Sequence, residues 1–501
     1  MKCYRAIELK RAQDDLQVPF ELSLPATTAP PGSGAAHPAP TAPLWTCNAI
    51  LRWLPGKRLV LQVTQGQQQR LAKVFFTRRD LKRELRGHQL LERNGITTAA
   101  LEARYTDAEP GEGTADIILY QWLDAFTLEQ LDAMVPLQAS SPALHQSIAA
   151  VATMHRQGLR QVDIHPGNFL YDGAQLWVVD SAAVSGHRRP LRARLARENL
   201  ADLLAQFYPA QVDDLERLWQ HYCQHWAQPN WRLADLPASI EKMRALRWRH
   251  YQRKLTRSCS EFQCQHNTRR LQVWRRDHDH ETMRTALADP DRIMAGGQAL
   301  KRGNTATVAG VDIAGSAVII KRYNIKNWRH RLSRCWRPSR AWRSWHNAHF
   351  LRFNGIPTPQ PLALIEERRG PLRGRAFFFC ERVTGDDLKT YLVTARPDDR
   401  AEMLATLGGI IGQYWKAGIS HGDMKADNFI VSATGLTIID LDPMAHHRSE
   451  QALTRALSKD IKRFINNFDG DLRATIAREL ATRLPTALAA AAKEQATANP
   501  R

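Results

Sequence analysis

The stretch HGDMKADN, residues 421–428, decides the interpretation of this 501-residue sequence. Within it, Asp423 is followed five positions later by Asn428, and twelve residues further on the apolar run LTIID ends in Asp440. Transfer of a phosphoryl group from ATP needs a carboxylate that orients the acceptor hydroxyl and receives its proton, and it needs oxygen ligands for Mg²⁺. The pattern therefore predicts phosphoryl transfer, with Asp423 as the candidate base and Asn428 and Asp440 as candidate Mg²⁺ ligands.

This arrangement resembles the catalytic loop and the metal-binding strand of the protein-kinase-like superfamily. The resemblance implies that Lys425 steadies the transferring phosphate, and that Lys321, in the strand-like run VIIKRY, holds the α- and β-phosphates of ATP. Gly303 lies at the turn of the preceding hairpin, whose backbone N–H groups could cover the phosphates. The run FFFCERV is typical of the strand and hinge against which adenine stacks, where Glu381 and Val383 could offer backbone hydrogen bonds.

The first half of the chain carries the same residue types in the same order. Lys73 lies in the strand-like run RLAKVFF, and Glu84 follows eleven residues later in a predicted helix, where it could pair with that lysine. Asp163 and Asn168 repeat the five-residue spacing, and Asp180 ends the run LWVVD twelve residues later. The implied roles are nucleotide binding for Lys73 and Glu84, catalysis for Asp163, and Mg²⁺ binding for Asn168 and Asp180.

The two halves depart from the pattern in different ways. In the first half, Gln161 stands where the second half has His421, the residue that usually braces the catalytic loop. In the second half, Ser344 stands where the first half has Glu84, and a basic insert with three Trp lies between Lys321 and Ser344. This insert could contact an anionic membrane or a phosphorylated glycan.

The order of predicted elements is strands followed mostly by helices, and it occurs twice. We expect an α+β protein with two tandem protein-kinase-like domains, each with a β-rich N-lobe and a helical C-lobe. The expected organisation is an N-terminal segment with a Pro/Ala-rich linker (1–47), a divergent first domain (48–240), a basic helical connector (241–290) and a second domain (291–501).

The composition limits the possible partners and compartments. Lys and Arg number 70 against 50 Asp and Glu, which leaves a net charge of +20. Seven cysteines do not indicate a disulfide framework in a chain of this length, and no stretch approaches the roughly 20 apolar residues of a membrane span. The N-terminus does not resemble a secretion signal. A cytoplasmic protein is therefore expected, and the family resemblance described next implies a peripheral position on the inner face of the inner membrane.

The second half resembles the bacterial lipopolysaccharide core kinases that phosphorylate Kdo or heptose. The resemblance extends over roughly residues 250 to 470 and rests on several segments in order: RKLTRSCSEF, LKRGNTATV, VIIKRYNIK, RPSRAWRSWHNAHFLRFNGIPTPQPLALIE and HGDMKADN. The first half resembles a more divergent member of the same family. What the family implies is an ATP- and Mg²⁺-dependent kinase whose partners are lipopolysaccharide core oligosaccharide, or a lipid-linked glycan, and the anionic inner-membrane surface.

Other functions remain open at this point. One domain, more readily the first, could be a pseudokinase that binds glycan or acts as a scaffold in core assembly. A kinase with a protein or an antibiotic as its acceptor is compatible with the same fold, because a fold does not determine the acceptor. The positive charge could also serve nucleic acid, but the sequence carries no recognisable nucleic-acid-binding module, and no nucleic-acid partner is expected.

Overall fold

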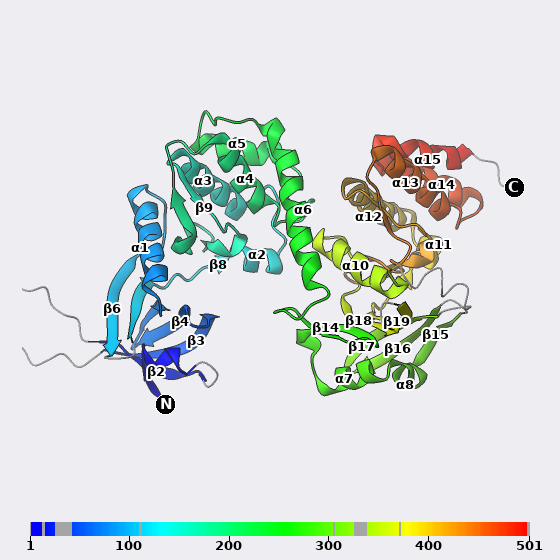
Figure 1. Cartoon of the computed structure of the whole chain (residues 1–501). Helices are drawn as coiled ribbons and strands as arrows, with labels where there is room; N and C mark the ends of the chain where they lie inside the picture. Colours follow the sequence, from blue (N-terminus) through cyan, green and yellow to red (C-terminus); the bar gives the residue numbers. More distant parts are fainter. Residues whose placement is uncertain are drawn as a thin grey trace, which may run out of the picture. The chain divides into compact units, whose positions relative to one another are not determined.

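The structure is a computed structural model that describes residues 2–12, 16–25, 43–109, 113–303, 306–324, 338–369 and 372–497. The chain divides into two units: the first runs to Arg244 without Tyr208–Ala210, and the second contains those three residues and Ala245 onward. In each unit the strands of one large sheet gather at one end and most helices at the other (Figure 1). The predicted mixture of helices and strands is thus confirmed.

The first unit is built on a seven-stranded sheet of order β1-β2-β3-β4-β5-β7-β6. Its strands are β1 (Cys3–Arg5), β2 (Phe20–Ser23), β3 (Leu44–Leu54), β4 (Arg58–Gln65), β5 (Gln68–Phe75), β6 (Leu101–Glu109) and β7 (Gly113–Gln121). The helices are α1 (Arg78–Arg93), α2 (Leu128–Met134), α3 (Pro142–Arg156), α4 (Ala193–Leu204), α5 (Leu215–His225) and the first part of α6 (Leu236–Lys254), which continues into the second unit from Ala245. Short strands complete the unit: β8 (Phe126–Thr127), β9 (Leu159–Gln161), β10 (Phe169–Tyr171), β11 (Leu176–Val178) and β12 (Val184–Gly186).

The second unit has a seven-stranded sheet of order β13-β14-β18-β19-β17-β16-β15. Its strands are β13 (Phe262–His266), β14 (Arg270–Arg275), β15 (Gln298–Arg302), β16 (Ala306–Ile313), β17 (Ser316–Tyr323), β18 (Pro361–Arg369) and β19 (Leu372–Glu381). The helices are α7 (Glu281–Ala288), α8 (Pro290–Ala295), α10 (Arg340–Phe353), α11 (Leu388–Thr394), α12 (Pro397–Lys416), α13 (Glu450–Ile465), α14 (Gly470–Arg483) and α15 (Thr486–Thr497). The short strands are β20 (Asp386–Asp387), β21 (Ile419–Ser420), β22 (Phe429–Ser432), β23 (Gly435–Ile438) and β24 (Ala445–His446).

Five strands follow one another in the same spatial order in both sheets. The order β3-β4-β5-β7-β6 of the first unit corresponds to β15-β16-β17-β19-β18 of the second. The additional strands join different edges, because β1 and β2 extend the sheet beyond β3, whereas β13 and β14 extend the other sheet beyond β18. None of the helices in the described part of the chain combines the length and the apolar composition of a membrane span.

The segment between the two predicted domains differs from the expectation. Residues 241–290 were expected to form a basic helical connector; α6 and α7 lie at the two ends of this range, but β13 and β14 lie between them and pair with each other. Leu271 and Val273 are buried, whereas the intervening Gln272 is only partly so, which is the period-two pattern of a strand. The basic composition of the segment obscured this alternation in the sequence.

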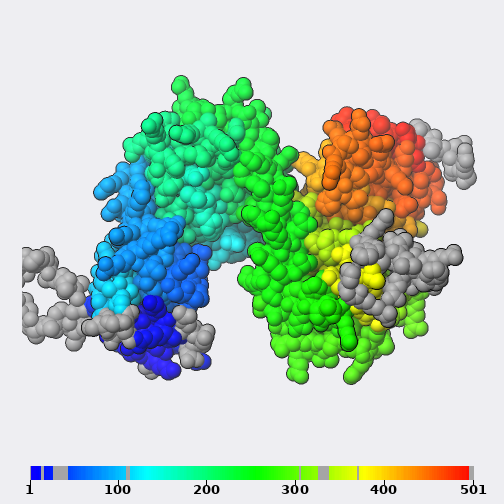
Figure 2. All heavy atoms as spheres, viewed as in Figure 1, coloured from blue at the N-terminus to red at the C-terminus, as the bar shows by residue number. Residues whose placement is uncertain are grey.

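The N-terminal residues also contribute more than a linker. β1 pairs in parallel with β2, and β2 pairs in antiparallel with β3, so these strands extend the first sheet. The residues of β1 and β2 are dark blue in Figure 2. Phe20 and Leu22 are buried in the core below that sheet. Residues 26–42, which hold most of the predicted Pro/Ala-rich linker, lie outside the described residues.

Helix α1 lies directly against the short 3-10 helix η3 (Ser181–Ala183), which follows the strand-terminal Asp180. The contact is close at Gly87, where a Cβ atom would lie 1.8 Å from the carbonyl oxygen of Ser181. Glycine is therefore required at this position, because any side chain would separate the helix from η3. The helix begins after Thr77, whose hydroxyl accepts a hydrogen bond from the N–H of Asp80 at 3.2 Å.

We predict that Gly87→Ala destabilises the first unit by about 1–3 kcal/mol, because the added methyl group overpacks the contact with Ser181. The matched control is Gly409→Ala in α12, where a Cβ has no neighbour within 4 Å and the exchange should stabilise the helix by up to about 1 kcal/mol. Urea unfolding followed by circular dichroism measures both. Equal stability of the two variants would show that α1 is not held so close to η3.

Candidate active site

The loop that carries Asp423 is fixed to the following strand by hydrogen bonds. His421 is buried, and its Nε2 lies 3.1 Å from the carbonyl oxygen of Ile439. The side-chain amide of Asn428 donates to the carbonyl oxygen of Asp423 at 2.8 Å, and the carbonyl of Asn428 accepts from the N–H of Ile439 at 2.9 Å. Asp440 comes next with φ of 60°, a left-handed conformation that costs energy for a residue other than glycine. The structure thus brings three of the predicted site residues together.

Two cations and a buried acid surround this loop. Arg463 of α13 hydrogen-bonds the carboxylate of Asp423, and Lys425 Nζ lies 3.7 Å from the same carboxylate. Asp460, one turn earlier in α13, accepts a hydrogen bond from the N–H of Gly422 at 2.9 Å. Burial raises the pKa of Asp460 above its usual value. The candidate base therefore lies between positive charges, on a loop that α13 holds in place.

Lys321 of β17 contacts the strand-terminal acids and not a helix. Its ammonium group hydrogen-bonds Asp440 and lies 3.4 Å from Asp442. Burial alone would raise the pKa of Asp440, but the charge of Lys321 outweighs it and lowers this pKa to about 2. Burial alone would lower the pKa of Lys321, but Tyr323 and the two acids raise it above its usual value. The pair is therefore fully ionised at neutral pH.

Helix α10 is tied to the same acids by a residue that the sequence analysis did not single out. Arg340 Nε donates to Asp442 at 2.6 Å, and Asp442 is buried. Ser344, at the position matching Glu84, hydrogen-bonds the hydroxyl of Tyr323 at 2.7 Å and not Lys321. In this pair the helix supplies the cation, Arg340, and the end of the strand supplies the acid, Asp442. A strand lysine paired with a helix glutamate has the opposite arrangement of charges. The basic insert predicted before Ser344 falls largely on residues 325–337, outside the described part of the chain.

We predict that Arg340→Gln destabilises the second unit by about 1–3 kcal/mol, because it leaves the buried carboxylate of Asp442 with one partner fewer. Arg352→Gln in the same helix is the control, since Arg352 is exposed and, within the described residues, its side chain hydrogen-bonds only the carbonyl of Thr358, at 3.4 Å. Thermal denaturation of the full chain compares the two. If both variants melt alike, Arg340 does not hold α10 to the strand end.

In the first unit the lysine pairs with the helix. Lys73 Nζ lies 2.6 Å from Oε1 of Glu84, which is fully buried. Glu84 also accepts hydrogen bonds from the hydroxyl of Tyr120 at 3.1 Å and from the N–H of Ala182 at 3.2 Å. A buried carboxylate with a cation and two further donors is well compensated for its lost hydration. Glu84 therefore connects β5, β7 and the residues after Asp180.

Asp180 is the strand-terminal acid of the first unit, and it is already paired. It has φ of 59°, as its counterpart has 60°. Arg58 of β4 donates to its carboxylate at 3.2 Å, and Arg52 of β3 lies 3.8 Å away. Burial alone would raise the pKa of Asp180, but Lys73 and Arg58 lower it. The guanidinium groups of Arg58 and Arg52 thus lie beside Asp180, the carboxylate predicted to bind Mg²⁺.

The loop of the first unit is braced by an amide where the second unit uses an imidazole. Gln161 Nε2 donates to the carbonyl of Val179 at 2.7 Å, and the amide of Asn168 donates to the carbonyl of Asp163 at 2.8 Å. Both bonds recur 260 positions later, at His421 and Asn428. Glutamine therefore preserves the geometry of the loop without a titratable group.

A buried chain of hydrogen bonds holds Gln161 from behind. His155 of α3 is fully buried, with Nδ1 2.8 Å from the hydroxyl of Tyr222 and Nε2 3.1 Å from Oδ1 of Asn199. The amide of Asn199 in turn donates to the carbonyl of Gln161 at 2.8 Å. Burial lowers the pKa of His155 to about 4. The loop is therefore supported by an imidazole that stays neutral in the folded protein.

The lowered pKa predicts how the stability of the first unit depends on pH. Because the folded state excludes the proton, the contribution of neutral His155 is complete above pH 6.5 and is lost as the pH falls towards 4. The loss amounts to about 3 kcal/mol. In His155→Gln, unfolding free energy should fall less between pH 7 and pH 4.5, whereas the exposed-histidine control His225→Gln should keep the wild-type slope. Urea unfolding across this range is the measurement, and unchanged slopes in both variants would contradict the prediction.

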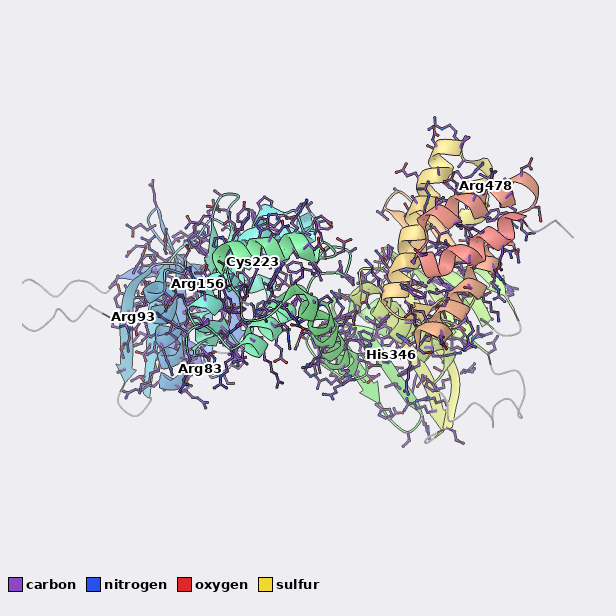
Figure 3. All side chains as sticks on the ribbon, turned by 90° about the horizontal axis from the view of Figure 1, so that it is seen from above. Arg83, Arg93, Arg156, Cys223, His346 and Arg478 are labelled. Carbon is purple, nitrogen blue, oxygen red and sulfur yellow. The ribbon has the colours of Figure 1, made fainter. Side chains whose placement is uncertain are left out.

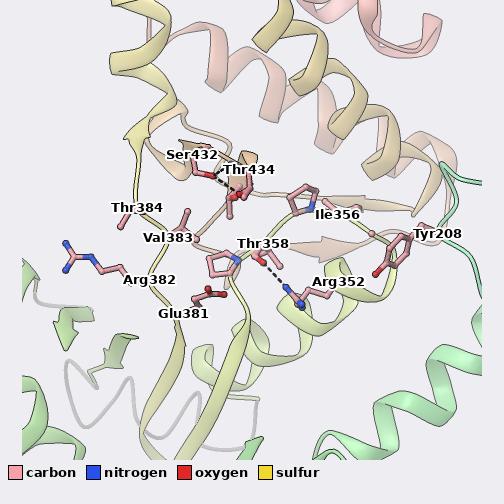
Figure 4. Close-up of a pocket in the computed structure, with 15 residues that line it drawn as sticks. Tyr208, Arg352, Ile356, Thr358, Glu381, Arg382, Val383, Thr384, Ser432 and Thr434 are labelled. Carbon is pink, nitrogen blue, oxygen red and sulfur yellow. Dashed lines mark hydrogen bonds between the residues drawn. The ribbon is translucent and has the colours of Figure 1, made fainter. Parts of the chain in front are cut away.

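The remaining predicted residues lie at the hairpin and the hinge. Gly303 follows β15 at the hairpin, and its N–H donates to the carbonyl of Ala306 at 3.1 Å. Glu381 ends β19, and its N–H donates to the carbonyl of Gln360 at 2.9 Å, so only its carbonyl could bind a base. Glu381 and Val383 also line a pocket of about 500 Å³ (Figure 4). This pocket lies between the hinge, the loop before β18 and the β22–β23 hairpin, and its lining does not include Lys321.

Sequence reasoning missed residues that act from another part of the chain. Arg340 and Arg58 contact acids more than one hundred positions away, and no spacing rule relates them. Asp460 did leave a signal, because it interrupts the apolar face of α13 formed by Leu457 and Ile461. A charged residue on the buried face of a helix usually has a specific partner, which here is the loop of Asp423.

Comparison with known proteins shows what the second unit is similar to. Residues 293–483 match the model of the lipopolysaccharide kinase (Kdo/WaaP) family. One curated relative is the 3-deoxy-D-manno-octulosonic acid kinase of Vibrio vulnificus (strain YJ016), which is 29% identical; the match covers 29% of this chain and 65% of the relative. Another is the 3-deoxy-D-manno-octulosonic acid kinase of Stenotrophomonas maltophilia (strain R551-3), which is 26% identical; the match covers 33% of this chain and 69% of the relative. The chain thus spans about two thirds of the length of these relatives.

Two solved structures are also similar. WaaP in complex with acyl carrier protein is 18% identical, with coverage of 41% of this chain and 87% of the other and a TM-score of 0.31. The amicoumacin kinase hAmiN in complex with AMP-PNP, Ca²⁺ and Ami is 14% identical, with coverage of 41% and 80% and a TM-score of 0.31. The family match and the curated relatives thus make the second unit similar to kinases. More narrowly, the resemblance to the lipopolysaccharide core kinases predicted from the sequence is confirmed for the second unit.

Proposed function

We propose that the second unit transfers the γ-phosphoryl group of ATP to a sugar hydroxyl, Kdo or heptose, of the lipopolysaccharide core. The observation that carries the proposal is the convergence of Lys321, Asp440, Asn428 and the Asp423 loop in that unit. The match of residues 293–483 to the lipopolysaccharide kinase family supports a core sugar as the acceptor. The acceptor itself follows from this similarity and not from the geometry.

The second unit offers suitable ligands for a magnesium nucleotide. The amide nitrogen of Asn428 is used by the carbonyl of Asp423, which leaves its side-chain oxygen for a metal. Asp440 supplies a carboxylate with a lowered pKa. Mg²⁺ in kinases is bound by one or two such protein oxygens together with the phosphates, where it would neutralise the charge that develops on the transferred group.

The side chains of the second unit divide the remaining tasks. Asp423 would orient the acceptor hydroxyl and accept its proton as the oxygen attacks phosphorus. Lys321, whose pKa is raised, stays protonated and would move from Asp440 to the α- and β-phosphates. Lys425 and Arg463 lie beside the Asp423 carboxylate and would stabilise negative charge on the transferring phosphoryl group. Gly303, Glu381 and Val383 are proposed to bind the nucleotide through their backbone.

We further propose that the first unit is a divergent tandem copy of the same domain. Its support is the shared strand order and the hydrogen bonds that recur 260 positions apart. Two observations favour a pseudokinase that binds glycan or acts as a scaffold: Gln161 replaces the histidine brace, and Arg58 and Arg52 neutralise Asp180. The surplus of positive charge supports attachment to the anionic inner leaflet, on the cytoplasmic side, as a further part of the proposal.

We predict that Asp423→Asn lowers phosphorylation of purified core oligosaccharide by about 10²–10⁴-fold, because the acceptor loses its general base. Asp163→Asn is the matched change in the first unit and should leave the rate unchanged. Mass spectrometry of the oligosaccharide, with an increment of one phosphate, measures both. Stabilisation of the Asp423→Asn variant by Mg·ATP in a thermal shift assay controls for folding. Full activity in Asp423→Asn together with loss in Asp163→Asn would place catalysis in the first unit.

A further inference from the structure

A group of five cations lies on two turns of α1, in the first unit. Its members, here called the α1 basic cluster, line one hollow of about 400 Å³ and consist of Arg78, Arg79, Lys82, Arg83 and Arg86. No other residue lines this hollow. All five side chains are exposed, and Figure 3 shows Arg83 of the cluster together with Arg93, near the end of the same helix.

The cluster has almost no partner within the described part of the chain. Arg83 makes a long contact of 3.5 Å with the carbonyl of Ala182, and no hydrogen bond or ion pair joins the other four to a described residue. The acids of the helix are directed elsewhere, since Glu84 is buried against Lys73 and Asp80 accepts from the hydroxyl of Thr77. The positive charge of this face is therefore not neutralised by the fold.

Such a face destabilises the free protein. Positions four apart on a helix are neighbours, so the pairs Arg78/Lys82, Lys82/Arg86 and Arg79/Arg83 set like charges against each other. Isolated exposed arginines carry no such cost. A hollow lined by five cations concentrates the positive potential at one place, where a group with several negative charges would relieve the repulsion.

The shape and the surroundings of the cluster argue against a nucleotide base and against insertion into a membrane. The hollow of about 400 Å³ is open to solvent and is bounded by side chains of a single helix. The lining contains no aromatic ring on which a nucleotide base could stack. None of the large exposed apolar side chains of the described residues lies on α1, so this face lacks the anchors that a helix needs to enter a membrane.

We infer that the α1 basic cluster is a binding site for a phosphorylated saccharide that carries two or more closely spaced phosphate groups; the charge and the hollow support the phosphate groups, and the saccharide rests on the proposed function. The guanidinium groups of four arginines offer paired donors to phosphate oxygens, and Lys82 adds a point charge. The site lies on the outer side of the helix whose inner side holds Glu84, so it is separate from the residues proposed for phosphoryl transfer. It holds whether or not the first unit is catalytically active.

The test compares two double variants of the full chain that remove equal charge. Lys82→Gln/Arg86→Gln alters the cluster, and Arg93→Gln/Arg156→Gln alters two exposed arginines outside it. Calorimetric titration with fructose 1,6-bisphosphate at low salt, with fructose as the unphosphorylated reference, measures the binding. We expect the cluster variant to raise Kd at least fivefold and the control variant to leave it within twofold of the wild type. Thermal melting without ligand should show the cluster variant at least as stable as the wild type, because like charges are removed.

Two results would overturn the inference. Equal Kd values for all three proteins, or no saturable binding by the wild type, would show that the cluster is not a phosphosaccharide site. Sedimentation with vesicles of phosphatidylglycerol and phosphatidylcholine tests the other source of phosphate. If the cluster variant alone loses vesicle binding while its affinity for fructose 1,6-bisphosphate is unchanged, the cluster serves a membrane surface and the saccharide assignment is wrong.

Discussion

The peptide carbonyl directly before the strand-terminal aspartate is the point on which both units depend. In the second unit this carbonyl, of Ile439, meets the imidazole of His421, and in the first unit that of Val179 accepts from Gln161. The bond fixes the peptide plane, and the next residue is then held at φ near 60° in both units. A strained backbone persists only where its surroundings determine it. Both strand-terminal aspartates therefore share one backbone conformation.

The two units neutralise the charge of the corresponding strand lysine in different ways. Lys73 is paired with Glu84 of the neighbouring helix, which leaves Asp180 to the guanidinium groups of Arg58 and Arg52. Lys321 has no such glutamate and rests on the strand-terminal acids. Since a buried charge without a partner is costly, each arrangement must be complete in itself. A nucleotide could replace Asp440 as the partner of the second lysine, whereas in the first unit it would have to displace two arginines.

Spacing along the sequence predicted those parts of the site that lie on one loop and its strand. The interval from Asp423 to Asn428 determines that the amide reaches back to the loop, so this bond could be anticipated. The bond between Arg340 and Asp442 could not, because it joins residues 102 positions apart and depends on how α10 packs. The chain from His155 through Asn199 to Gln161 was hidden for the same reason. Spacing along the sequence therefore predicts contacts within one loop, but it does not predict ion pairs between residues that packing brings together.

The ion pairs show which part of the net charge of +20 is neutralised within the fold and which part is not. Several arginines form ion pairs within their own unit, which neutralise their charge. Arg58 pairs with Asp180, and Arg463 pairs with Asp423. An excess that is spread evenly would attract any anion weakly and would be screened within about 8–10 Å at physiological salt. The five cations of α1 are different, since they share one hollow without an acid. The part of the charge that we infer to select a partner is therefore local, and it belongs to the unit in which the strand-terminal Asp180 is already paired with arginines.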